Sequence, residues 1–146
     1  MYFIDRSKIE QTLLYMEEIL QELGKHTYTS TMEKLSLERM AHMLIESTVD
    51  VGNMMIDGFI MRDPGGYEDI IDILVDEKVI PAEDEDHYKA VIRLRSSLVK
   101  EYLTLDHVNL NAVMLENKAV LEKFSTYVRT YLDNELGVAH AFSNES

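Results

Sequence analysis

A stripe of apolar residues from Leu37 to Phe59 most limits the folds open to this chain. Its members recur at spacings that place them on one face of an α-helix, namely Leu37, Met40, Leu44, Val51, Met55 and Phe59. Several positions in this stretch are methionine, a flexible side chain that adapts to irregular core packing. A helix of this length is typical of the central helix of a bundle.

The segment before this stripe predicts one further helix over residues 6–23. Ser7-Lys-Ile-Glu10 has the pattern of a capping box, in which the serine hydroxyl and the glutamate carboxylate each accept from a free backbone amide. Gly24 stands where a left-handed residue is needed to end the helix. The polar connection that follows places the start of the second helix near Thr31 or Ser36.

The segment after the stripe predicts three more helical regions, beginning with a short helix after the Pro and Gly break at Arg62–Gly66. Pro81 suits the first position of a fourth helix. Asp106 suits the N-cap of the last helical region, which bends near Asn117 and ends at Gly137.

Strand-like alternation and internal repeats are absent from the sequence. We therefore expect an all-α, antiparallel (up-and-down) bundle of four long helices plus a short one. Residues 1–136 are predicted to form a single domain, and residues 137–146 a flexible tail.

Composition excludes several classes of function. The chain of 146 residues has 27 acidic and 14 basic residues and a net charge of −13, so extended wrapping of nucleic acid is not expected and any RNA contact must be local. No contact with DNA is expected. Without cysteine there can be no disulfide or thiolate zinc site. No apolar run is long enough to span a membrane and no signal peptide is visible, so we expect a cytoplasmic protein.

The histidines do not predict a metal site. Asp84-x-x-His87 is the only carboxylate-x-x-His in the chain, whereas a di-iron bundle needs that spacing twice with two further glutamates. The remaining histidines are interpreted as surface or hydrogen-bonded side chains, namely His26, His42, His107 and His140. No cofactor is predicted.

A basic stretch interrupts this acidic chain. Four cations and no acid lie between Lys89 and Lys100, namely Lys89, Arg93, Arg95 and Lys100. A local reversal of charge can hold an anionic partner, because fixed charge attracts ligands of opposite sign. The alternative is a solvated helix face whose cations are paired with the surrounding acids.

The order of features from Leu37 to Leu132 resembles the HepT-like branch of the HEPN superfamily, small all-helical proteins that include toxin ribonucleases. The matching pieces are the helix Glu38–Asn53, then Tyr67–Leu74 followed by Val79-Ile-Pro81, and then Arg95-Ser-Ser-Leu-Val-Lys-Glu-Tyr102. The family pattern in the last piece is Arg, four residues, His, one residue, Tyr. Arg95 and Tyr102 match it, and Lys100 replaces the histidine.

The resemblance implies a metal-independent endoribonuclease in which the 2′-OH of RNA attacks the adjacent phosphate. Arg95 would then bind the phosphate, with Arg93, Ser96 and Lys100 beside it, and Arg95, Lys100 and Tyr102 would be the catalytic motif. Ser96 replaces an asparagine that is common after the arginine. Lysine, whose ordinary pKa is about 10.4, cannot accept a proton near neutral pH unless burial lowers its pKa. We therefore expect catalysis to be weakened or lost.

The resemblance also implies partners. Residues five apart on a helix differ in direction by about 140°, so Arg95 and Lys100 are not expected to converge on one ligand within a single chain. A homodimer with a shared cleft around Arg95 would bring both copies together. In toxin–antitoxin pairs of this family a nucleotidyltransferase antitoxin attaches AMP to the motif tyrosine, which is Tyr102 here. Otherwise Tyr102 is a packed amphipathic aromatic.

Three hypotheses follow. The first is an RNA-cleaving toxin that holds the phosphate through Arg95 and Lys100. The second is a non-catalytic helical dimer that binds a nucleotide or a protein partner, and the third is a purely structural dimer without a ligand.

Overall fold

The computed structural model describes residues 3–143, and the side chains of residues 3–137. Every regular element in residues 3–143 is helical, which confirms the predicted all-α class. The elements are α1 (Arg6–Glu22), α2 (Thr31–Gly58), α3 (Tyr67–Asp76), the 3₁₀ helix η1 (Ala82–Asp84), α4 (Glu85–Ile92), α5 (Leu94–Lys100), the 3₁₀ helix η2 (Tyr102–Thr104), α6 (His107–Glu116) and α7 (Lys118–Ser143).

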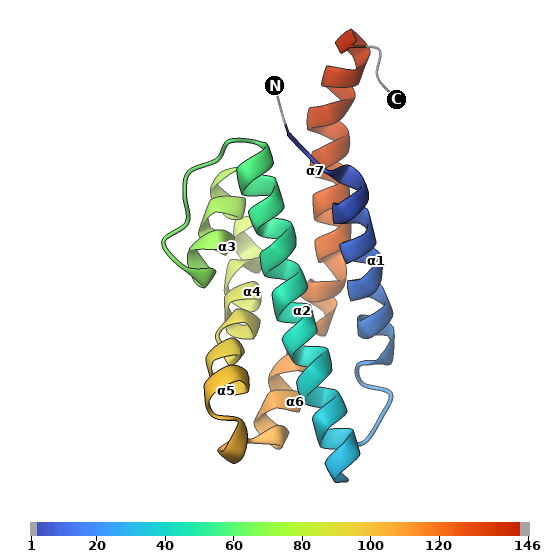
Figure 1. Ribbon diagram of the computed structural model, residues 1–146, viewed down its shortest axis with the longest axis vertical. Coiled ribbons are helices and arrows are strands. Elements are labelled where there is room, and N and C mark those ends of the chain that lie inside the picture. The colour runs from blue at the N-terminus through green and yellow to red at the C-terminus, as the bar shows by residue number, and fades with distance from the viewer. Residues whose placement is uncertain (1–2, 144–146) are drawn as a thin grey trace.

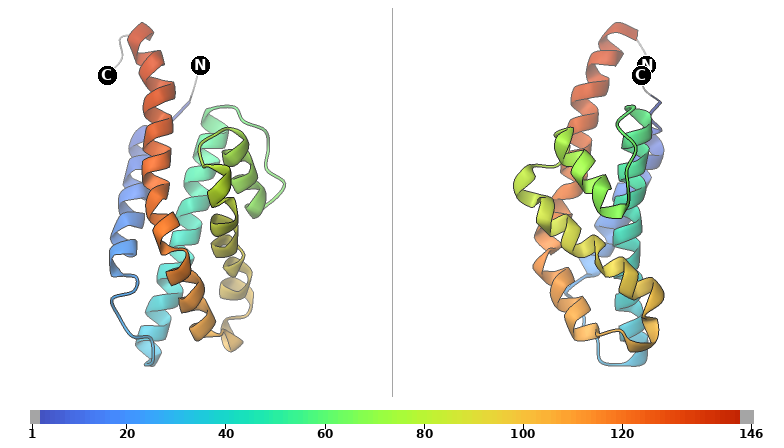
Figure 2. Two further views of the ribbon diagram at one scale, coloured as in Figure 1. Left: turned by 180° about the vertical axis from the view of Figure 1, so that it is seen from behind. Right: turned by 90° about the vertical axis from the view of Figure 1, so that its left-hand side faces the viewer.

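The helices form an up-and-down bundle around α2 (Figure 1). α1 runs down one side of α2, α3 rises on the other side, α4 and α5 descend there, and α6 and α7 return upward. The views in Figure 2 show α6 continuing into α7 as one bent column, and α4 continuing into α5. The four predicted long helical regions and the short α3 are therefore present, with breaks at Arg93 and at Asn117.

The core lies between α2 and the helices on its two sides. Its largest fully buried side chains come from most of the helices: Tyr88, Phe124, Ile9, Leu13, Met16, Leu23, Leu37, Leu44, Ile45, Met55, Ile56 and Ile71. Gly52 permits α3 to pack closely on α2, because a Cβ atom at this position would lie 2.5 Å from Cγ2 of Ile70. This close approach brings the start of α3 beside the middle of α2.

The cap predicted at the start of α1 is wrong. Asp5 is the N-cap, and its carboxylate accepts from the backbone amide of Lys8 at 3.0 Å, whereas Ser7 lies inside the helix. Glu10, the other half of the predicted box, bonds to Arg129 on α7. The prediction at the other end of α1 is confirmed, because Gly24 follows the helix with a φ of 90°.

Ser30 and Glu33 form the capping box of α2, so the helix starts at the earlier of the two predicted positions. Asp106 caps α6, as predicted, by accepting from the amide of Asn109. The last helix does not end at Gly137 as predicted but continues to Ser143. The rest of the predicted tail, residues 144–146, lies outside the described residues.

No helix among the described residues is both long enough and apolar enough to cross a membrane.

Candidate functional site

The basic stretch lies on α4 and α5, on the side of α2 opposite α1. α4 ends at Ile92 and α5 begins at Leu94, so Arg93 occupies the junction. Lys100 is the last residue of α5, and Tyr102 opens η2. The predicted motif therefore starts in α5 and ends just beyond it.

A hollow of about 510 Å³ lies between α5 and the start of α3. Arg93, Arg95, Ser96 and Lys100, the four predicted phosphate ligands, all line it. Its opposite wall is the segment Gly65–Asp69. Arg95 and Lys100 both border this hollow, although their positions differ in direction by about 140° around a regular helix.

Most cations of the basic stretch are paired with acids of neighbouring helices. Three ion pairs join α4 and α5 to α2 and α3: Lys89 to Asp72 at 2.6 Å, Arg93 to Glu68 at 2.9 Å, and Arg95 to Glu46 at 2.6 Å. Lys100 is exposed and forms no ion pair with the described residues. The paired-cation interpretation therefore holds for these three cations, whereas Lys100 is open to a ligand.

Arg95 is fixed at one edge of its guanidinium group and open at the other. Its Nε donates to Glu46 at 2.6 Å, and its Cζ atom lies 4.3 Å from the centre of the Tyr67 ring. The hydrogen bond to Glu46 raises the pKa of Arg95. Its two terminal nitrogens donate no hydrogen bond to the described residues. They can therefore present a pair of donors to a phosphate group.

Tyr102 lies outside this hollow, with 62% of its surface exposed. It is therefore not the packed aromatic that the alternative interpretation required. The apolar side chains around it in sequence are also exposed: Val99 by 39%, Leu103 by 87% and Val108 by 83%. The end of the motif thus presents an apolar surface next to Lys100.

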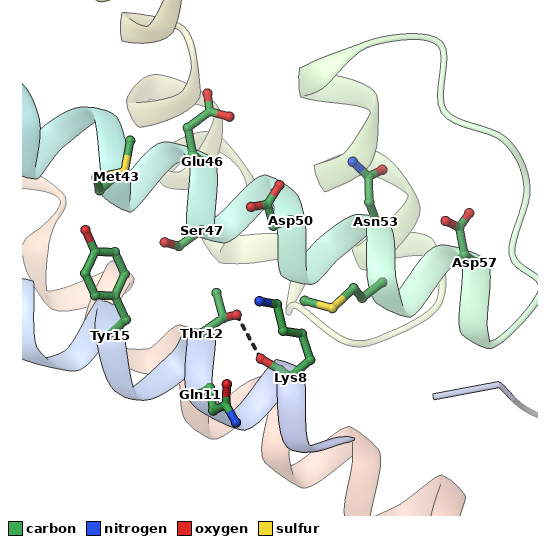
Figure 3. A pocket seen from close by; sticks show the side chains of 11 residues that line it. Lys8, Gln11, Thr12, Tyr15, Met43, Glu46, Ser47, Asp50, Asn53 and Asp57 are labelled. Atoms are coloured by element: carbon green, nitrogen blue, oxygen red, sulfur yellow. Dashed lines mark hydrogen bonds between the residues drawn. The ribbon is translucent and has the colours of Figure 1, made fainter. Parts of the chain in front are cut away.

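A second hollow, of about 560 Å³, lies between α1 and α2 (Figure 3). Its charged lining is mainly acidic, with Glu46, Asp50 and Asp57 from α2 and Lys8 from α1. Partial burial, followed by the charge of Glu46, raises the pKa of Asp50. These carboxylates repel phosphate, so the hollow beside α5 is the better candidate for an anionic ligand.

Sequence reasoning missed the residues that hold Arg95 in place. Glu46 lies 49 positions before Arg95 and Tyr67 lies 28 positions before it, so no local spacing links them. Two sequence features could have drawn attention to these residues. Glu46 is an acid among the apolar positions of α2, and Tyr67 is an aromatic residue directly after two glycines.

Comparison with known proteins agrees with the fold and with the family resemblance. Residues 9–128 match the family described as Ribonuclease HepT-like. The chain is 47% identical over 143 residues to the protein named "Putative RNase YutE" of Bacillus subtilis (strain 168), covering 97% of this chain and 99% of that one.

Two solved structures are similar to the chain. The structure of YutE from Bacillus subtilis, described as a cytosolic protein of unknown function, superposes with a TM-score of 0.91 at 47% identity, covering 94% of this chain and 96% of that one. A crystal structure described as a toxin–antitoxin with AMP-PNP has a TM-score of 0.66 at 17% identity, covering 83% of this chain and 95% of that one, and so shares the fold. The family match and the 47% identical relative establish that the chain belongs to the HepT-like ribonuclease family.

Proposed function

We propose that the protein binds RNA through its phosphates in the hollow beside α5, and that Lys100 in place of the motif histidine weakens or abolishes cleavage. The observation that carries this proposal is the convergence of Arg93, Arg95, Ser96 and Lys100 on one hollow. Membership of a ribonuclease family supports RNA as the source of the phosphate.

Only a few hydrogen-bond donors in the hollow are free to contact a phosphate. Arg93 is already bound to Glu68. Asp69, which lies beside Glu68 in the opposite wall, accepts two hydrogen bonds from Arg62. The donors left for a phosphate are the terminal nitrogens of Arg95, the Lys100 ammonium and the Ser96 hydroxyl. A site with so few phosphate contacts binds with modest affinity that falls as salt increases.

Lys100 can stabilise charge on the phosphate but is poorly suited to remove the 2′-OH proton. Its side chain is exposed, and a lysine ordinarily keeps its proton at neutral pH unless burial removes the charged form. Phosphate binding therefore survives the replacement of histidine, whereas general base catalysis by residue 100 does not.

A homodimer completes this proposal. Val99, Tyr102, Leu103 and Val108 expose apolar surface at the end of the motif, where a two-fold interface would bury it. Such an interface would place the hollows of the two chains in a shared cleft, as the family resemblance implies.

Tyr102 is the residue that a nucleotidyltransferase antitoxin would modify. Its exposed side chain is accessible to another protein. The structural neighbour described as a toxin–antitoxin with AMP-PNP supports a partner of this kind. An AMP group on Tyr102 would add negative charge close to Lys100 and reduce phosphate binding.

The second candidate is a non-catalytic dimer that binds a nucleotide or a protein partner. The ion pairs of Lys89, Arg93 and Arg95 favour it, because they neutralise most of the charge that would attract a long RNA.

The test measures both RNA binding and RNA cleavage for the wild type, Arg95→Ala and Lys100→His. Arg6→Ala is the matched control, since Arg6 is an exposed arginine that pairs with Asp133 away from the hollow. RNA binding that is lost in Arg95→Ala and kept in Arg6→Ala is expected, with cleavage greatest in Lys100→His.

Failure of the wild type to bind RNA at low salt would refute this function and favour the second candidate. Equal loss of binding in Arg95→Ala and Arg6→Ala would also refute it, because the effect would then reflect net charge alone.

A further inference from the structure

The acidic hollow between α1 and α2 holds polar side chains that no described residue engages. The carboxylates of Asp50 and Asp57 form no ion pair and accept no hydrogen bond from the described residues, and the Asn53 amide is equally unpaired among them. Glu46, the third acid of the lining, is already held by Arg95 at 2.6 Å. Two carboxylates and one amide are therefore free to bind a ligand.

These three side chains follow one edge of α2. Asn53 comes three residues after Asp50, and Asp57 comes four residues after Asn53, so all three project within about 60° of one another around the helix. Asp50 and Asp57 are separated by about 10 Å along the axis. Figure 3 shows the three in a row beside the space between the two helices. The row therefore offers a carboxylate, an amide and a carboxylate over two helical turns.

Ser47 independently indicates a ligand in this hollow. Its side chain is only 6% exposed and points into the space between α1 and α2 (Figure 3), but its hydroxyl forms no hydrogen bond with the described residues. The hydroxyls of Thr12 and Thr48, by contrast, each donate to the carbonyl oxygen four residues earlier at 2.8 Å. A buried hydroxyl without a partner costs free energy, and a ligand that bonds to it removes that cost.

The spacing favours an extended organic cation over a metal ion. Carboxylate oxygens bind a metal at about 2.0–2.6 Å, so two carboxylates about 10 Å apart along a helix are not expected to share one. The described residues contain no group of three His, Cys, Asp or Glu side chains that could hold a metal. Met43 and Met54 line the same hollow and offer flexible apolar surface to the methylene groups of an organic ligand.

We propose that this hollow binds a linear aliphatic triamine. One terminal ammonium lies between the Asp50 carboxylate and the Ser47 hydroxyl, which can accept two of its three hydrogen bonds. The internal ammonium donates to the amide oxygen of Asn53, and the other terminal ammonium pairs with Asp57. The methylene groups between the nitrogens pack against the thioether side chains.

Lys8 opposes this ligand but does not replace it. It is the one cation among the described residues that line the hollow, and it forms no ion pair with any of them. Partial burial, and then the charge of Glu46, still raises the pKa of Asp50 despite this lysine. The negative charge at Asp50 is therefore not fully compensated within the chain.

The test measures binding of spermidine, a triamine, and putrescine, a shorter diamine, by isothermal titration calorimetry at low salt. The variants are Asp50→Asn, Asp57→Asn and Ser47→Ala, with thermal melting as a check on folding. Asp63→Asn is the matched control, because Asp63 is an exposed aspartate outside the hollow and has no ion pair among the described residues.

Spermidine is expected to bind at one site per chain. Asp50→Asn and Asp57→Asn should each weaken its binding by about three- to tenfold, and Asp63→Asn by less than about twofold. Ser47→Ala should weaken binding without lowering Tm, because the hydroxyl that it removes has no partner in the free protein. Lys8→Gln should tighten binding by about two- to fivefold.

Putrescine cannot span the two carboxylates and should bind at least about fivefold more weakly than spermidine. Equal weakening of spermidine binding in Asp50→Asn, Asp57→Asn and Asp63→Asn would overturn the site, because the effect would then reflect net charge alone. Absence of saturable spermidine binding to the wild type would overturn it as well. Weaker binding in Lys8→Gln would also count against it, since a cation in the hollow must compete with the ligand.

Discussion

Arg129 and Arg95 are both bound by carboxylates, but they differ in how many of their donors are used. Arg129 on α7 donates to Glu10 through Nε and Nη2 and to Glu17 through Nη1, at 2.7 to 2.9 Å. Arg95 donates only from Nε, to Glu46, among the described residues. Their exposures are similar, at 33% and 26%, so burial does not distinguish them.

The difference indicates separate roles. The two carboxylates around Arg129 belong to α1, so this cluster ties the first helix to the last and leaves little capacity for a ligand. Arg95 is positioned by one carboxylate and by the face of Tyr67, and its terminal nitrogens remain available. We infer that Arg129 acts in folding and Arg95 in binding.

The largest expected effect is on the stability of the Arg129→Ala variant. Removal of the guanidinium leaves Glu10 and Glu17 close together without the cation that bridges them, and we expect a loss of about 2 kcal/mol in the free energy of unfolding. For a domain of this size that loss lowers Tm by roughly 4–8 °C. Urea and thermal denaturation would measure it.

Arg95→Ala provides the comparison, with an expected loss below about 1 kcal/mol because it breaks one partly exposed pair. RNA affinity should show the opposite order, with a larger loss in Arg95→Ala than in Arg129→Ala. Equal destabilisation by the two substitutions would remove the distinction between these arginines.

The second expected effect is a decrease, at acidic pH, in the stability that the Arg129 cluster contributes. Hydrogen bonds from Arg129 lower the pKa of Glu10 and of Glu17 below the ordinary glutamate value of 4.5. Each carboxylate therefore contributes stability above about pH 4.5 that is lost as the pH falls through its lowered pKa in the folded protein. The stability gap between wild type and Arg129→Ala should shrink by about half between pH 7 and pH 3, allowing for screening of these partly exposed groups.

Urea titrations at several pH values would measure this gap directly. A gap for Arg129→Ala that is equally large at pH 3 would show that packing of the arginine side chain, and not its charge, stabilises the bundle.

Most of the fold was predictable because helices are encoded by local spacing. The apolar stripe of α2, the glycine after α1 and the cap at Asp106 each depend on residues within a few positions of one another. The end of α7 was mispredicted because one glycine costs a helix only about 1 kcal/mol relative to alanine, which does not stop it when helix-compatible residues follow Gly137.

The site was predictable only in part. Family resemblance indicated Arg95, Lys100 and Tyr102 as candidate site residues, and the charge pattern indicated the basic stretch. Neither could show that Glu46 and Tyr67 hold Arg95, because these contacts depend on how α2 and α3 pack against α5. Long-range ion pairs leave no periodic signal in the sequence.

A smaller effect is expected when Glu46 is replaced by Gln, a change that removes the charge competing with phosphate for Arg95. An exposed or half-exposed ion pair contributes at most about 1 kcal/mol, so RNA affinity should rise by up to about fivefold. Fluorescence anisotropy with a labelled single-stranded RNA would measure the change. Glu10→Gln is the control and should reduce stability without altering affinity, and a weaker affinity in Glu46→Gln would mean that Glu46 supports phosphate binding instead of competing with it.

The smallest effect is expected at Tyr67, whose ring lies beneath the Arg95 guanidinium. A cation–π contact at a partly exposed site contributes about 0.5–1 kcal/mol, so Tyr67→Leu should lower RNA affinity by roughly two- to fivefold. Tyr67→Phe keeps the ring and should bind like the wild type. Tyr15→Leu is a matched control, since Tyr15 has a similar exposure but lines the acidic hollow.

The pair of Tyr67 variants separates the ring from the hydroxyl group. Loss of affinity in both variants would assign the effect to the hydroxyl, and loss in neither would show that Glu46 alone orients Arg95. A loss confined to Tyr67→Leu would mean that the ring orients the guanidinium without occupying its hydrogen-bond donors. Among the described side chains Arg129 has no cation–π partner, and carboxylates take its donors themselves. An aromatic face can therefore hold an arginine ready for a ligand in a way that a second carboxylate cannot.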